Sequence, residues 1–145
     1  MFKAIDIANY IINKCIDLGR PITNLQLQKI LYYVQGEFIK QTGGKELFYN
    51  EISAWQYGPV VPDVYFEFNT YSASDLNTKI DTSELPKAIK RIIDPVIEEK
   101  SLLSAWKLVE YTHREKPWLE SYVEGQKNII DLEKMRRHFL SKQVN

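Results

Sequence analysis

At 145 residues, with 44% hydrophobic and 26% charged side chains, the chain has the length and composition of one soluble globular domain, residues 1–145. Its 19 basic residues balance its 19 acidic residues, and this neutrality argues against recognition of nucleic acid through the phosphate backbone. A single cysteine, Cys15, excludes an internal disulfide and a multi-cysteine metal site. With neither a membrane-length apolar run nor a signal-peptide pattern, we expect a cytoplasmic protein without membrane contact.

Two helices are predicted in the first part of the chain. Apolar residues recur at helical spacing from Ile5 to Ile16, and the pattern stops at Gly19. The single cysteine lies on this apolar stripe, so we expect it in the core. Thr23 and Gln26 then form a T-x-x-Q capping box for a second helix, which ends at two consecutive glycines, residues 43–44.

A polar stripe formed by Gln28, Tyr32 and Gln35 runs along the second predicted helix, beside its apolar stripe. Two interpretations remain open. The glutamines tie down loop backbone, because a buried amide must find partners. Alternatively, the stripe presents an amide-and-phenol face to a partner.

Residues 45–61 interrupt the helical pattern. The stretch ISAWQY has β propensity but no obvious second strand, so we expect irregular structure or a minimal hairpin with the preceding ELFYNE. Trp55 and Tyr57 stand directly before the break formed by Gly58 and Pro59. Such a stiff aromatic segment is either a rigid corner between helices or a surface that loses little entropy when a partner covers it.

Further helices are predicted in the second half. Pro62 starts a short one, and the pair Asp81 and Glu84 marks the start of another, which Pro95 kinks or ends. Ser101 is expected to cap the next helix. Its apolar stripe comprises Leu102, Trp106, Val109 and His113, which places Trp106 in the core.

The last predicted helices are a short one that begins at Pro117 and an amphipathic one over DLEKMRRHFLSK, residues 131–142, with Met135 and Phe139 inward. The predicted class is therefore all-α (mainly α). It is a compact bundle of about six helices, with an irregular or short β-hairpin insert around residues 45–61.

The residues indicate no catalytic or metal site. His113 and His138 are the only histidines, and each stands alone, whereas zinc requires three or four ligands. The sequence contains no glycine-rich phosphate loop and no nucleophile elbow. A Cys15–His113 dyad is left open. We expect no cofactor and no metal.

Three motifs together resemble a known family. They are ITNLQLQKILYYVQG at residues 22–36, WQYGPVVPDVY at 55–65 and THREKPW at 112–118. Their order and spacing resemble the Panacea antitoxin domain, whose members include SocA-like antitoxins and phage-associated GepA-like proteins. The final helix also fits the ending of the family.

The resemblance implies an antitoxin that neutralises a cognate protein toxin, encoded beside it, by direct binding. Because some SocA-like members deliver their toxin to the ClpXP protease, a delivery adaptor is the first alternative. The second is an enzyme that uses His113 and Glu115, with Gln28 and Gln35 as substrate-binding amides in one closed pocket. A DNA-binding autorepressor is disfavoured by the neutral charge.

The resemblance also marks a signature set of residues, which either contact the partner or hold the fold. The signature set is Gln28, Tyr32, Gln35, Trp55, Tyr57, Gly58, Pro59, Tyr65, His113, Glu115 and Trp118.

Overall fold

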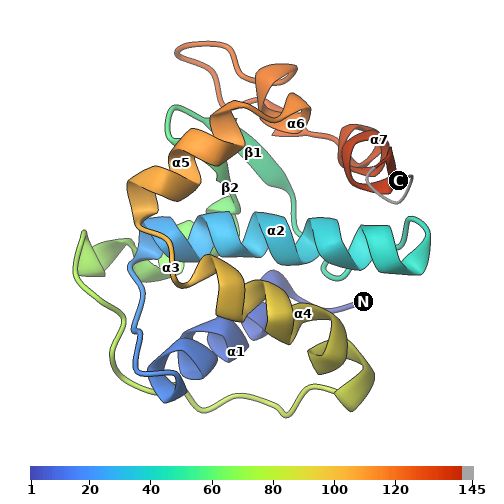
Figure 1. The fold of residues 1–145 in the computed structure, drawn as a ribbon. Helices are drawn as coiled ribbons and strands as arrows, with labels where there is room; N and C mark the ends of the chain where they lie inside the picture. Colours follow the sequence, from blue (N-terminus) through green and yellow to red (C-terminus); the bar gives the residue numbers. More distant parts are fainter. Residues whose placement is uncertain (142–145) are drawn as a thin grey trace.

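Helix α2 (Asn24–Thr42) runs through the middle of the molecule, and the other elements pack around it (Figure 1). The computed structural model describes residues 1–141. Helices α1 (Ala4–Asp17) and α4 (Lys87–Lys100) lie on one side of α2. The strands, α5 (Ala105–His113) and α6 (Lys116–Leu119) lie on the other side.

Two further helices complete the bundle. Helix α3 (Pro62–Phe68) starts at Pro62 as predicted and continues into a 3₁₀ turn, η1 (Asn69–Tyr71). Helix α7 (Leu132–Ser141) lies beside the C-terminal end of α2 (Figure 1). The mainly α class is confirmed, and none of the helices in residues 1–141 has the length and apolarity to cross a membrane.

The capping box of α2 is confirmed. The Thr23 hydroxyl accepts a hydrogen bond from the Gln26 backbone N–H at 3.2 Å, and the Gln26 side chain accepts one from the Thr23 N–H at 2.9 Å. These two bonds satisfy donors that the first turn of a helix leaves free. The helix ends where Gly43 adopts a left-handed conformation, with φ of 72°.

A small antiparallel sheet occupies part of the predicted insert. Strand β1 (Ile52–Trp55) pairs with β2 (Gly58–Val60) on one edge and with β3 (Ile129–Ile130) on the other. The expected pairing with ELFYNE is therefore wrong. The chain reverses over residues 56–57, and Gly58 follows in a conformation with φ of 108°, which an L side chain rarely adopts.

The predicted start of α4 is also wrong. The helix begins at Lys87, directly after Pro86, and not near Asp81. A proline disfavours the helical conformation of the residue before it, which explains why the helix does not reach back from Pro86 to Leu85, and residues 81–86 have no regular secondary structure. Pro95 does not end the helix, which continues through it to Lys100.

The cap of α5 corrects the placement of Trp106. Ser104, and not Ser101, caps the helix by accepting a hydrogen bond from the Lys107 N–H at 3.1 Å. Ser101 instead ends α4 and receives hydrogen bonds from Arg20. Trp106 consequently lies in the first turn of α5 on the solvent side, 61% exposed, where the sequence pattern predicted a core position.

Helix α7 docks on α2 through a close contact at a glycine. A Cβ atom on Gly36 would lie 2.3 Å from the ring of Phe139, so only glycine leaves room for that ring. Met135 and Phe139 are buried, as predicted, and so is Cys15 on α1. The predicted last residue of this helix, Lys142, lies outside the described residues.

Candidate functional site

The turn of the β1–β2 hairpin is held by side chains from the last of the three motifs. The Trp118 indole N–H donates to the Trp55 carbonyl at 2.8 Å. His113 Nε2 lies 3.0 Å from the Gln56 carbonyl, and because a carbonyl only accepts, Nε2 carries the proton. Burial lowers the pKa of His113, so the neutral imidazole donates this bond at neutral pH.

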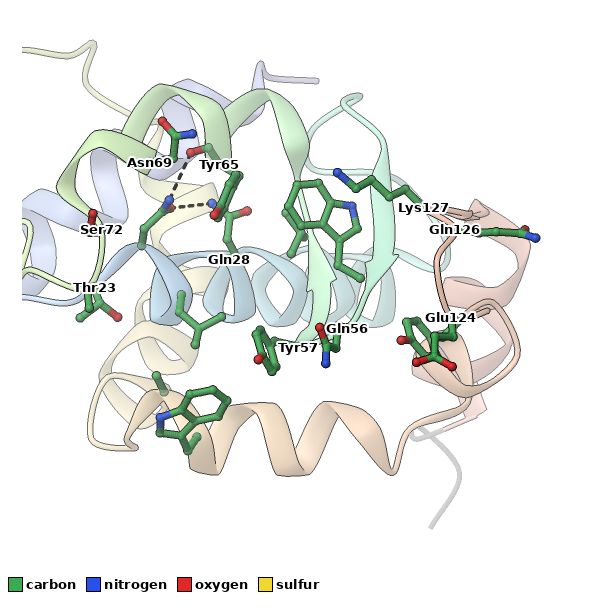
Figure 2. A pocket seen from close by; sticks show the side chains of 18 of the residues that line it. Thr23, Gln28, Gln56, Tyr57, Tyr65, Asn69, Ser72, Glu124, Gln126 and Lys127 are labelled. Carbon is green, nitrogen blue, oxygen red and sulfur yellow. Dashed lines mark hydrogen bonds between the residues drawn. The ribbon is translucent and has the colours of Figure 1, made fainter.

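The end of the hairpin is held from α2. The Gln28 side-chain oxygen accepts from the Val61 N–H at 2.9 Å, and its amide nitrogen donates to Asn24 at 2.9 Å. Asn24 in turn donates to the Tyr65 carbonyl at 3.1 Å. This chain of amides fixes the passage from β2 into α3, and Figure 2 shows the bonds that reach Gln28 and Tyr65.

Gln35 holds the backbone of the segment before the hairpin. Its oxygen accepts from the Leu47 N–H at 2.7 Å, and its nitrogen donates to the Phe48 carbonyl at 2.9 Å. Both Gln28 and Gln35 are buried. The two glutamines therefore hold loop backbone, which is the first of the two interpretations of the polar stripe.

A buried lysine, which the sequence reading missed, also holds the hairpin. Lys29 is fully buried, and its Nζ donates to the Pro59 carbonyl at 2.8 Å. Burial lowers the pKa of Lys29 to about 7, because the interior disfavours the charged form. One feature of the sequence could have indicated the burial of Lys29. Residues 24–36 contain a single charged residue, which is typical of a helix buried on all sides.

Gly58 is required at this junction by the space as well as by its positive φ. A Cβ atom there would lie 2.7 Å from Thr112 Oγ1 and 3.0 Å from Lys29 Cε. The hairpin backbone is thus in direct contact with both α2 and α5.

Glu115 forms a separate, half-buried cluster. Its carboxylate accepts from the hydroxyls of Tyr32 at 2.8 Å and Tyr33 at 3.0 Å, and His138 Nε2 lies 3.6 Å away. Burial alone would raise the pKa of Glu115, but nearby His138 and the two phenols outweigh it, so the pKa lies below its ordinary value. The cluster joins α2, the residue before α6, and α7.

The four residues of the enzyme hypothesis do not converge. His113 binds the hairpin turn, Glu115 binds the two tyrosines, and Gln28 and Gln35 bind different loops. Gln28 lines one cavity of residues 1–141 and Glu115 lines another, and neither cavity is lined by a second member of the four. The single pocket that this hypothesis requires is therefore not formed by these side chains. No cluster of three or more metal-ligating side chains is found in residues 1–141.

Beside the hairpin lies the aromatic groove, with a volume of about 810 Å³ (Figure 2). It is lined by the start of α2, the hairpin turn, α3, the first turn of α5 and the loop after α6. Figure 2 shows Gln56 and Tyr57 at the hairpin turn, between α2 and α5. The aromatic side chains that line the groove are Trp55, Tyr57, Tyr65, Trp106 and Tyr122.

Four rings of the aromatic groove meet edge to face in two pairs. Tyr57 and Trp106 have ring centroids 5.2 Å apart, and Trp55 and Tyr65 have centroids 5.0 Å apart. Tyr57 is 47% exposed, and Trp106, which no sequence motif marked, is more exposed still. Edge-to-face contact favours this relative orientation of the two rings in each pair.

Most of the signature set is buried or partly buried. Four of its members line the aromatic groove: Gln28 is buried, Trp55 and Tyr65 are partly exposed, and Tyr57 is exposed. His113 and Glu115 are partly buried by their hydrogen-bond partners. The buried members are Gln28, Tyr32, Gln35, Gly58, Pro59 and Trp118.

Comparison with curated proteins finds the antitoxin SocA of Caulobacter vibrioides (strain NA1000 / CB15N), which is 32% identical over 89 residues. The alignment covers 61% of this chain and 47% of that protein, so the match spans about half the length of the relative. No solved structure matches the chain. The family described as antitoxin SocA-like, Panacea domain, matches residues 27–119, which include the whole signature set. The chain belongs to this family of SocA-like Panacea domains.

Proposed function

We propose that this protein is an antitoxin that neutralises a protein toxin by binding it directly, and that the aromatic groove is part of the contact surface. Membership of a family of SocA-like antitoxin domains supports the general role. The observation that carries the direct contact is the Tyr57–Trp106 pair, two large aromatic side chains that stay exposed beside a hairpin whose backbone is fixed.

The hairpin beside the groove is already held in place before binding. Binding costs conformational entropy for every side chain and loop that it orders. Here the carbonyls of Trp55, Gln56 and Pro59 are already held by Trp118, His113 and Lys29. Exposed aromatics on such a rigid frame are typical of the few residues that supply most of the energy of an interface.

The test is coexpression with the open reading frame that lies next to the gene. That neighbour should arrest growth when induced alone, and this protein should relieve the arrest and copurify with the product of the neighbouring gene. A neighbour that arrests growth and is not relieved by this protein would overturn the antitoxin function.

The contribution of the groove has a matched control on the same chain. Tyr57 and Tyr49 are exposed to a similar degree, 47% and 52%, but Tyr49 lies outside the groove. A variant with Tyr57→Ala and Trp106→Ala should lose neutralisation, whereas Tyr49→Ala should retain it. Equal neutralisation by both variants would place the contact elsewhere.

Capping and delivery for degradation are separated by the amount of toxin. If the antitoxin caps the toxin, growth resumes while the toxin level stays constant, with or without ClpXP. If it acts as an adaptor, the toxin level falls on antitoxin expression only in cells that contain ClpXP.

A further inference from the structure

The aromatic groove carries almost no charge. Among its lining residues, only Glu124 and Lys127 are ionised, and they have opposite signs. Both come from the loop after α6 and lie at one end of the groove, away from Thr23 and Ser72 (Figure 2). Charge complementarity therefore favours an uncharged occupant over an acidic or basic one.

The side chains of the groove are suited to an extended occupant. Five of them are aromatic, whereas Leu25 and Val60 are the only branched aliphatic ones. Amphipathic helices bind in hydrophobic grooves, whereas polyproline II segments bind in grooves lined by aromatic side chains, as this one is. Proline rings fit flat between aromatic rings, and the segment is already extended, which lowers the entropy that binding must remove.

The groove also contains a hydrogen-bond donor without an acceptor. The indole N–H of Trp55 is buried and has no partner in residues 1–141, although a buried tryptophan N–H usually has one. The amine of Lys127 lies 4.5 Å from the centre of the Trp55 ring and belongs to an exposed side chain of the loop after α6. A polyproline II segment makes no internal hydrogen bonds, so each of its carbonyls is free to accept.

From these three observations we propose that the aromatic groove binds an uncharged, extended segment that contains proline. The inference rests on the proposed function in one respect, namely that this segment belongs to the toxin. In the complex, proline rings pack against Tyr57 and Trp106. The Lys127 side chain moves aside, and a backbone carbonyl of the segment accepts from the Trp55 N–H.

The experiment is a titration of the ¹⁵N-labelled full chain with a decaproline peptide, followed by the three tryptophan indole signals. The signals are assigned with Trp55→Phe and Trp106→Phe variants. Decaproline should shift the Trp55 and Trp106 signals saturably. The Trp118 signal should shift less than these two, because Trp118 is buried and does not line the groove.

Variants and control peptides decide the outcome. Tyr57→Ala should weaken decaproline binding about tenfold, as is usual for an aromatic anchor, while Tyr49→Ala should leave the affinity unchanged. Since both side chains are exposed, both variants should remain folded and unfold cooperatively on heating. The proposal is overturned if decaproline shifts no indole signal, if a glycine–serine peptide of equal length shifts them equally, or if a leucine-rich helical peptide binds more tightly.

This titration contains no toxin, so its result is independent of the coexpression experiment. If decaproline fails to bind while the protein still relieves growth arrest, the antitoxin function stands and the groove proposal falls. If decaproline binds and growth arrest is not relieved, the groove is a peptide site of a protein with another function.

Discussion

Replacing the buried Lys29 with methionine should abolish an unusual rise of stability with pH. Burial lowers the pKa of Lys29 from 10.5 to about 7 in the folded protein. Between these two values the unfolded chain holds a proton that the folded protein has released. Linkage therefore requires the free energy of unfolding to rise as the pH rises through this window, and this contribution is absent below about pH 7.

The size of the effect follows from the shift. Each pH unit well inside the window contributes about 1.4 kcal/mol, and with half-titration at the lower end the rise between pH 7 and 9 is about 2 kcal/mol. Above pH 9 the thiol of Cys15 works in the opposite direction, because burial raises its pKa from 9.0 to about 11. Lys29 is therefore best observed between pH 7 and 9.

The assay is urea denaturation followed by tryptophan fluorescence at several pH values between 7 and 9. The wild type should gain stability across this range, and Lys29→Met should show no such gain. Methionine also leaves the Pro59 carbonyl without its donor, which lowers stability by a constant amount, so the slope and not the absolute value is the readout. Lys116→Met, at an exposed position, should keep the wild-type slope. An unchanged slope in Lys29→Met would refute the reasoning.

Three further variants test the packing and the acidic cluster. Gly58→Ala should lower the free energy of unfolding by about 2 kcal/mol or more in urea denaturation, because the residue combines a φ of 108° with a Cβ contact at 2.7 Å. Gly36→Ala should cost about 1–3 kcal/mol through overlap with Phe139, and Phe139→Leu in the same chain should recover part of the loss; equal stability of the single and double variants would contradict the contact. Glu115→Gln should remove part of the acid sensitivity of the protein: the lowered pKa of Glu115 stabilises the fold above pH 4.5 and is lost as the pH falls below it, so the two stability curves should converge in acid.

The features that were predictable from the sequence are those decided by neighbouring residues. The capping box of Thr23 and Gln26 and the left-handed glycine after α2 involve only nearby backbone groups. The same holds for Pro62 in the first turn of α3. The apolar stripes also identify part of the core: Cys15 of α1 and Met135 and Phe139 of α7 are buried, whereas Ile5 and Ile16 of α1 are only partly buried.

The features that were missed depend on distant contacts or on a choice between similar local signals. Ser101 and Ser104 are both residues that can cap a helix. The predicted helix began at Ser101, and its apolar stripe wrongly placed Trp106 in the core. Lys29 looks like an ordinary surface lysine until Pro59, 30 residues along the chain, takes its hydrogen bond. Only part of the candidate site was therefore predictable. Tyr57 belongs to a sequence motif, whereas the position of Trp106 in the groove is seen only in the folded structure.

The hydrogen bonds that hold the hairpin turn also determine when the turn can take its final structure during synthesis. Trp118 is 63 residues beyond the Trp55 carbonyl that it holds, and His113 is 57 residues beyond the Gln56 carbonyl. The hairpin turn is synthesised long before either donor leaves the exit tunnel. The aromatic groove therefore takes its final form only after His113 and Trp118 have left the ribosome, so a shorter nascent chain lacks the side chains that hold the hairpin turn.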